Sequence, residues 1–151
     1  MTEAAVDSPL GPIRLMEEDG ALTRLRWPGE GAPPATPLLR EAAAQLAAYF
    51  AGTRTTFDLP LRPAGGPFEQ AVFAEMAAIP FGETLTYGEI AARLGTAAQP
   101  VGRACGANPL PIVIPCHRVL GASGLGGFSA SGGVEDKVWL LRHESAAGLL
   151  I

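Results

Sequence analysis

The sequence predicts an α+β fold with two domains, residues 1–64 and 65–151, because two kinds of hydrophobic pattern occur along the chain. Near the N-terminus apolar residues alternate with polar ones, which is typical of a half-buried strand. Later, apolar residues recur every three or four positions, which is typical of a helix. The stretch RPAGGP, residues 62–67, has the composition of a linker between the two parts. The 151 residues are 48% apolar, enough to fill one core or two small ones.

The N-terminal domain is predicted to begin with a β-hairpin. Ile13 and Leu15 alternate with polar neighbours, and Asp19-Gly20 is a favoured two-residue turn. The second strand would place one set of side chains on a single face: Ala21, Thr23, Leu25 and Trp27.

One helix is predicted to follow the hairpin. Thr36 suits the N-cap, Pro37 the first helical position and Gly52 the C-terminal stop. Between them, apolar residues fall at helical spacing: Leu39, Ala43, Leu46 and Phe50. A short extended segment, residues 57–61, completes this domain, so we expect a small sheet with one helix.

The C-terminal domain is predicted to be mostly helical. A first helix carries an apolar stripe that ends at the turn 80–82, and Thr86 with Glu89 forms a capping box for a second helix that ends at Gly95. The stripe consists of Phe68, Val72, Met76 and Ile79. A third helix is expected over residues 99–107. Two short helices joined by a tight turn suggest a helix-turn-helix, with a plain helical hairpin as the alternative.

Cysteine content and charge limit the function classes. Cys105 and Cys116 are too few for a disulfide framework or a four-cysteine zinc site, so a reducing, cytoplasmic setting fits best. The N-terminus lacks a secretory pattern and no apolar run suits a membrane span, so we expect neither export nor membrane insertion. The net charge of −4 argues against a protein that grips DNA mainly by neutralising phosphates.

The segment 109–119, PLPIVIPCHRV, carries the strongest chemical signal. Its three prolines predict an extended apolar strip that presents Cys116 and His117 at its end. A neighbouring histidine or arginine can lower the pKa of a thiol and make it a nucleophile, so Cys116 beside His117 and Arg118 is a candidate. The alternative is a buried, inert thiol, which is common for a cysteine in an apolar run.

Four segments together resemble the O6-alkylguanine-DNA alkyltransferases: TYGEIA, NPLPIVIPCHRV, GGFSASGG and KVWLLRHE. The resemblance is close over residues 67–151, whereas residues 1–66 resemble the family's variable N-terminal domain through SPLGPI and DGALTRLRW. It implies a ribonuclease-H-like N-terminal domain and a winged-helix-like domain that binds DNA. It further implies irreversible transfer of a methyl or larger alkyl group from O6-alkylguanine to Cys116 after base flipping. O4-alkylthymine stays open as a second substrate. No cofactor or metal is expected.

The resemblance also implies roles for individual residues. His117 would be the water-linked base for the thiol and Glu144 the carboxylate that orients it, whereas Tyr87 would rotate the target nucleotide and donate a hydrogen bond to the base. Asn108 would tie the backbone at the bend before the active-site segment. We expect base contacts from Pro111, Val119, Phe128, Ser129 and Ser131, and DNA contacts from Tyr87, Gln99, Arg103 and Arg118.

Two positions depart from the family pattern. Gln99 stands where relatives usually have an arginine that enters the base stack, and Arg103 is the nearest substitute on the same predicted helix. Phe128 stands where many relatives have tyrosine, and a two-residue insertion, 130–131, follows it. Ser129 and Ser131 could replace the missing hydroxyl.

The sequence is compatible with three functions. The leading one is single-turnover repair of double-stranded DNA by a monomer, because S-alkylcysteine has no leaving group for water to displace. The second is a lesion-binding sensor without chemistry, which the change at Gln99 favours and the presence of Cys116 disfavours. The third is a thiol hydrolase, which lacks a visible oxyanion hole. The sequence leaves open the size of the alkyl group.

Overall fold

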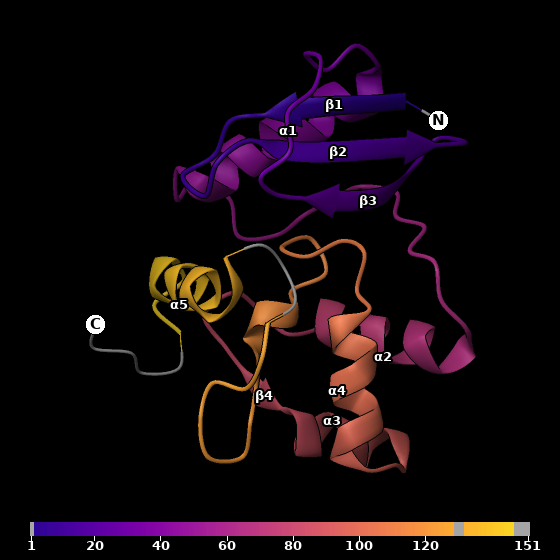
Figure 1. Ribbon diagram of the computed structural model, residues 1–151, viewed down its shortest axis with the longest axis vertical. Helices are drawn as coiled ribbons and strands as arrows, with labels where there is room; N and C mark the ends of the chain where they lie inside the picture. The colour runs from indigo at the N-terminus through magenta and orange to yellow at the C-terminus, as the bar shows by residue number, and fades with distance from the viewer. Residues whose placement is uncertain (1, 129–131, 147–151) are drawn as a thin grey trace. The chain divides into compact units, whose positions relative to one another are not determined.

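A computed structural model describes residues 2–128 and 132–146 of the chain (Figure 1). The chain divides into two compact units, Met1–Ala64 and Gly65–Ile151. A small sheet with one helix forms the first unit and short helices dominate the second, which confirms the predicted fold class. Among the described residues, no helix is both long and apolar enough to cross a lipid bilayer.

The first unit contains a three-stranded antiparallel sheet with the order β1-β2-β3: Thr2–Val6, Ile13–Glu18 and Ala21–Arg26. Asp19 and Gly20 both have positive φ, 49° and 77°, as a two-residue hairpin turn requires, so the predicted hairpin is confirmed. Strand β1 was not predicted from the sequence. A register shift between Met16 and Glu17 buries Leu22, whereas Thr23, expected on the inner face, is only partly covered.

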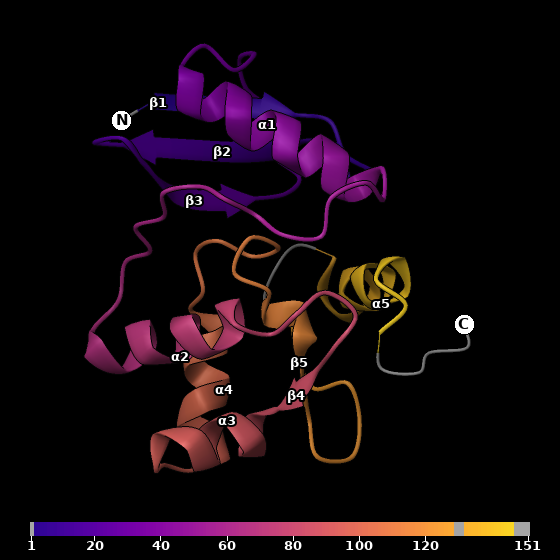
Figure 2. The ribbon, with the colours of Figure 1, turned by 180° about the vertical axis from the view of Figure 1, so that it is seen from behind.

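Helix α1, Pro37–Phe50, packs across this sheet (Figure 2). The Thr36 hydroxyl accepts a hydrogen bond from the Leu39 amide at 3.1 Å, and Gly52 has a φ of 81° just beyond the helix, so both predicted ends are confirmed. Leu61 then forms a parallel bridge with Leu22. The core between helix and sheet includes Ile13, Leu15, Leu25, Trp27, Leu39, Leu46 and Tyr49.

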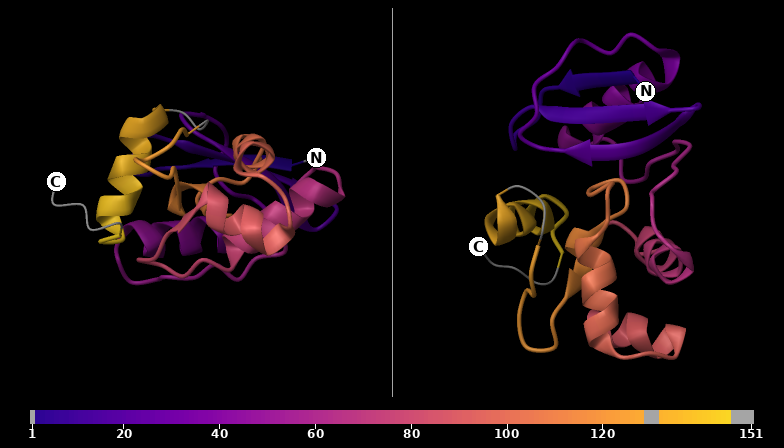
Figure 3. Two further views of the ribbon diagram at one scale, coloured as in Figure 1. Left: turned by 90° about the horizontal axis from the view of Figure 1, so that it is seen from below. Right: turned by 45° about the vertical axis from the view of Figure 1, so that its right-hand side comes forward.

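The second unit starts with three helices: α2, Pro67–Ala77; α3, Tyr87–Leu94; and α4, Ala98–Gly106. They pack against one another (Figure 3). Gly95, with a φ of 68°, ends α3. The capping box is confirmed: Thr86 Oγ1 accepts from the Glu89 amide at 3.0 Å, and Glu89 Oε1 accepts from the Thr86 amide at 2.9 Å. This box fixes Tyr87 as the first residue of α3.

A short parallel ladder and a last helix complete the second unit. Strand β4, Leu85–Thr86, pairs with β5, Val119–Leu120, which directly follows the 3₁₀-helix η1, Cys116–Arg118. Helix α5, Gly133–His143, packs on η1. The cysteine of the PCHR motif therefore lies in η1, which is followed by β5 and packs against α5.

Candidate active site

The segment before Cys116 is a compact turn, so the predicted extended strip is wrong. Ile112 has a φ of 76°, and the Ile114 amide donates to the Leu110 carbonyl at 2.8 Å. The Asn108 side chain closes the turn: its Oδ1 accepts from the Leu110 amide at 3.0 Å and its Nδ2 donates to the Ile114 carbonyl at 2.8 Å. The prolines restrict their own φ angles, but the two hydrogen bonds of the Asn108 side chain and the left-handed conformation of Ile112 reverse the direction of the chain.

Cys116 is a buried thiol, with 8% of its surface exposed. Burial raises its pKa to about 11, while a hydrogen bond from the Asn108 side chain and the charge of Lys137 act in the opposite direction. The pKa reduction expected from neighbouring His117 and Arg118 charges does not dominate. The resting thiol is therefore protonated near neutral pH, and nucleophilic attack requires a base.

His117 and Glu144 form a buried pair that can supply such a base. His117 Nε2 lies 2.7 Å from Glu144 Oε2, and both side chains are fully buried. Because a carboxylate only accepts, Nε2 carries the hydrogen and Nδ1 keeps its lone pair. Nδ1 has no hydrogen-bond partner among the described residues, and burial lowers the pKa of His117, which favours the neutral base. Glu144 acts oppositely, raising that pKa.

Arg118 holds Glu144 from the other side. Its Nε donates to Glu144 Oε1 at 2.8 Å, its Nη2 donates to Oε2 at 2.9 Å, and its Nη1 donates to the Ile79 carbonyl at 2.6 Å. The Gly82 amide makes a weaker bond to Oε1, 3.5 Å. Because the guanidinium is buried and directed inward, the DNA contact expected for Arg118 is replaced by an internal one.

Tyr87 and Lys137 meet at the loop that follows β5, residues 121–128. The Tyr87 hydroxyl donates to the Gly127 carbonyl at 3.4 Å, and Lys137 Nζ donates to the Gly127 carbonyl at 3.0 Å and the Val119 carbonyl at 2.6 Å. Burial lowers the pKa of Lys137 to about 8 and raises that of Tyr87. Negative charge on Cys105 or Cys116 contributes to both values, so the two thiols lie within electrostatic range.

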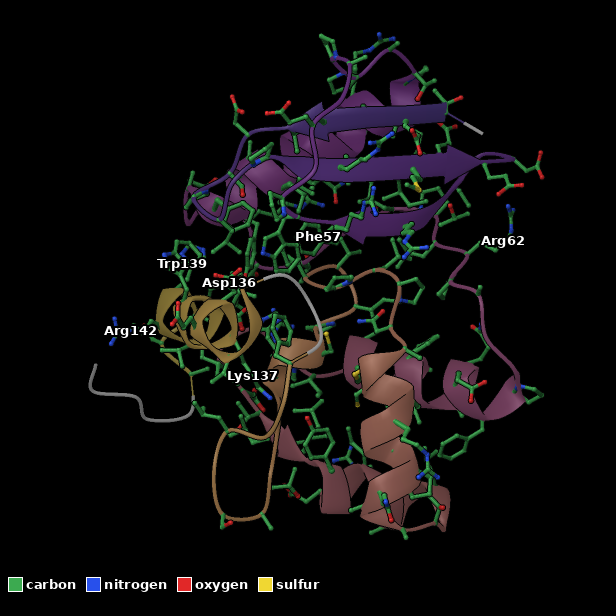
Figure 4. The ribbon with its side chains drawn as sticks, viewed as in Figure 1. Phe57, Arg62, Asp136, Lys137, Trp139 and Arg142 are labelled. Atoms are coloured by element: carbon green, nitrogen blue, oxygen red, sulfur yellow. The ribbon has the colours of Figure 1, made fainter. Side chains whose placement is uncertain are left out.

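Lys137 is a site residue that was not predicted from the sequence. It lies on α5 (labelled in Figure 4), three and four positions before the buried Leu140 and Leu141. A lysine on the apolar face of a helix was the available signal, because such a residue is rarely fully buried without partners. Glu144, the C-cap of the same helix, is likewise a buried charged residue.

The other expected residues have different surroundings. Gln99 and Arg103 are exposed on α4, Pro111 and Val119 are buried, and Phe128 is partly exposed. Ser129 and Ser131 lie outside the described residues. Within the described ranges, no three histidine, cysteine or acidic side chains gather as a metal site. The second unit thus brings Cys116, His117, Glu144, Asn108 and Tyr87 together, and this arrangement suits a thiol nucleophile activated by a neutral imidazole.

Both units match domains of one family. Residues 67–146 match the 6-O-methylguanine DNA methyltransferase DNA binding domain, and residues 1–63 match the 6-O-methylguanine DNA methyltransferase ribonuclease-like domain. The methylated-DNA--protein-cysteine methyltransferase of Mycobacterium tuberculosis is 44% identical, over 93% of this chain and 90% of that protein. The constitutive enzyme of the same name from Bacillus subtilis is 41% identical, over 91% and 92%.

Solved structures give the same result. The crystal structure of Mycobacterium tuberculosis OGT in complex with DNA matches with a TM-score of 0.84 and 42% identity, covering 94% of this chain and 91% of that one. An O6-methylguanine DNA methyltransferase from Methanococcus jannaschii matches with a TM-score of 0.67 and 30% identity, covering 93% and 92%.

Proposed function

The chain belongs to the 6-O-methylguanine DNA methyltransferase family, and from this we propose that it repairs double-stranded DNA by moving an alkyl group from guanine O6 to Cys116. One observation carries the assignment of the acceptor. Cys116 is the buried thiol next to an imidazole whose Nδ1 has no hydrogen-bond partner among the described residues and whose Nε2 is held by a carboxylate. Such a pair activates a nucleophile.

The reaction needs two proton transfers and one exchange of bonds. The Cys116 proton passes to His117 Nδ1 through a water molecule, because side chains of adjacent residues rarely touch. The thiolate then attacks the alkyl carbon, a sulfur–carbon bond forms, and the bond between carbon and O6 breaks. The guanine takes up the proton that His117 holds, so cysteine and alkylguanine become S-alkylcysteine and guanine. Atoms and charge balance without a cofactor.

Glu144 makes this transfer easier because its charge faces the imidazolium that forms. Arg118 shares the same carboxylate, so it limits how strongly Glu144 attracts the proton and keeps the carboxylate ionised and fixed. The resting histidine stays neutral, and the charged histidine exists only while the proton is in transit.

The target base has to leave the duplex to react. Cys116 is only 8% exposed, so a stacked base cannot reach the sulfur, and flipping costs a few kcal/mol. We assign the flipping to Tyr87 and to the exposed first turn of α4, which contains Gln99. All of the site residues lie in one unit, so a monomer suffices, and a thiol that must stay reduced fits the cytoplasm.

Two alternatives make different predictions. A lesion sensor would bind alkylated duplex DNA and leave Cys116 unmodified, and the exposed glutamine at position 99 is the observation that favours it. A thiol hydrolase is disfavoured because the Cys116 amide donates to the Ile114 carbonyl at 2.8 Å and is not available to an oxyanion. The test is stoichiometry with excess lesion DNA. Repair requires one alkyl group per chain and then no further reaction, whereas a hydrolase turns over an ester and a sensor transfers nothing.

A further inference from the structure

Lys137 is a fully buried cation that the reaction described above does not use. Removing an ammonium group from water is costly unless partners replace the water. Two carbonyl oxygens replace the water around the Lys137 ammonium group. One belongs to Val119, in β5 and three residues after Cys116, and the other to Gly127, in the loop 121–128. Lys137 on α5 (Figure 4) therefore links the loop 121–128 to β5, the strand that follows η1 and Cys116.

Tyr87 contacts the same loop from α3. Its hydroxyl donates to the Gly127 carbonyl, so Tyr87 and Lys137 share one acceptor, and Lys137 Nζ lies 5.9 Å from the centre of the tyrosine ring. The ring also lies close against the loop backbone. A Cβ at Gly126 would be 2.8 Å from Tyr87 Cε2, and Gly126 has a φ of 72°, so a side chain there would be strained and would collide with the ring.

We propose that Lys137 is a positioning residue that holds the loop 121–128 against Tyr87 as one wall of the alkyl-transfer site. This inference rests on the proposed function. When Tyr87 donates its hydroxyl to a flipped base, that hydroxyl leaves the Gly127 carbonyl. Lys137 is then the remaining side-chain donor at that carbonyl among the described residues, and it keeps the loop in place while Tyr87 changes partner.

Lys137 has a second, separable effect. Its positive charge acts on the Cys116 thiol and lowers its pKa, against the larger opposing effect of burial. Loss of the charge should therefore slow the reaction of Cys116 with a small thiol reagent, which needs the thiolate but no loop. Loss of the loop anchor should additionally slow transfer from a DNA lesion, which needs both.

The test compares Lys137→Met with Arg142→Met, an exposed cation on the same helix. Each protein is reacted with duplex DNA containing O6-methylguanine, to obtain the maximal transfer rate and the half-saturating concentration, and separately with iodoacetamide. For Lys137→Met we expect the maximal transfer rate to fall at least about tenfold, which corresponds to about 1.4 kcal/mol. Iodoacetamide alkylation should fall by a smaller factor, and Arg142→Met should leave both rates unchanged.

A double-variant cycle with Tyr87→Phe separates positioning from a general loss of structure. Because Lys137 and Tyr87 act on the same Gly127 carbonyl, the combined loss in transfer rate should differ from the product of the two single losses. Wild-type transfer by Lys137→Met, equal losses in the two assays, or simple multiplication of the losses would overturn the inference. If the wild-type protein itself transferred nothing, the proposed function would fail instead.

Gly126→Ala tests the same wall if Lys137→Met does not fold. The added methyl would collide with the Tyr87 ring, and neither Lys137 nor Cys116 is among its three nearest neighbours. Transfer from duplex DNA should again fall at least about tenfold, while the iodoacetamide rate stays near the wild-type value. Gly124→Ala is the matched control, because a Cβ there has no neighbour within 4 Å. Equal transfer rates in the two glycine variants would contradict the proposed wall.

Discussion

Arg118 grips both carboxylate oxygens of Glu144, with an Nε–Oε1 distance of 2.8 Å and an Nη2–Oε2 distance of 2.9 Å. This buried pair explains why His117 is fixed with its hydrogen on Nε2 and its lone pair on Nδ1. A carboxylate held ionised by a guanidinium can only accept from the imidazole. Arg118 thus influences the Cys116 thiol indirectly, by holding Glu144, which in turn orients His117.

Arg118→Met is expected to destabilise the second unit by about 3–5 kcal/mol, because it leaves the buried Glu144 charge uncompensated. Urea unfolding followed by fluorescence measures the change. Arg103→Met, which removes an exposed arginine from α4, is the control and should change stability by less than about 0.5 kcal/mol. Unchanged stability in Arg118→Met, together with a weaker salt dependence of DNA binding, would indicate that Arg118 contacts DNA and not Glu144.

The second unit is expected to lose stability in mild acid because of His117. Burial lowers the pKa of His117 in the folded chain, so the unfolded chain binds the proton more readily. Stability from this group is present above the unfolded value, about 6.5, and decreases by up to about 1.4 kcal/mol per pH unit below it. Unfolding free energies measured between about pH 5 and pH 7.5 should show this slope in the wild type and lose it in His117→Gln. Parallel curves for the two proteins would contradict the neutral, buried histidine.

Asn108→Ala is expected to slow alkylation of Cys116. The Asn108 side chain lowers the pKa of the thiol and also closes the turn from Leu110 to Ile114. A hydrogen bond to a charged group contributes about 1.5–3 kcal/mol, so the thiolate fraction near neutral pH should fall roughly tenfold or more. The rate of iodoacetamide alkylation measured against pH reports the thiolate fraction. Asn108→Asp tests whether the side-chain acceptor for the Leu110 amide is enough to keep the wild-type profile without the Nδ2 donor. An unchanged profile in Asn108→Ala would show that the amide acts only on the backbone.

Gln99→Arg is expected to tighten binding to a lesion in duplex DNA or to speed its repair, because a guanidinium stacks better than an amide and carries a charge. Gln99 lies exposed in the first turn of α4, so the change disturbs no packing. Ala92→Arg adds the same charge to the exposed side of α3 and controls for attraction to phosphates. A gain of equal size in both variants, or no gain in Gln99→Arg, would argue against insertion into the base stack.

The elements that the sequence predicted are those with local causes. The Asp19-Gly20 turn, the Thr36 and Thr86 caps and the Gly95 stop each depend on residues within a few positions, so their patterns are visible in the chain. Strand β1 was missed because Thr2–Val6 has weak alternation and gains its order from pairing with β2. The register shift beside Leu22 depends on the partner strand in the same way.

The resemblance of four segments to one family predicted the site residues Tyr87, Asn108, Cys116, His117 and Glu144. The local structure was not predicted, because three prolines suggested an extended strip where Asn108 and the left-handed Ile112 form a turn. The partners of Lys137 and the inward direction of Arg118 could not be predicted, because these partners lie 10 to 39 positions away along the chain. Contacts of that range depend on the packed fold.

Alkyl transfer to Cys116 is tested by the intact mass of the protein after reaction with one equivalent of duplex DNA containing O6-methylguanine. We expect a gain of one CH₂, located on Cys116 by peptide mapping, in the wild type and in Cys105→Ala, and no gain in Cys116→Ser. Tight binding to the lesion with no change in mass would contradict alkyl transfer and favour the sensor. A gain that persists in Cys116→Ser would place the acceptor elsewhere.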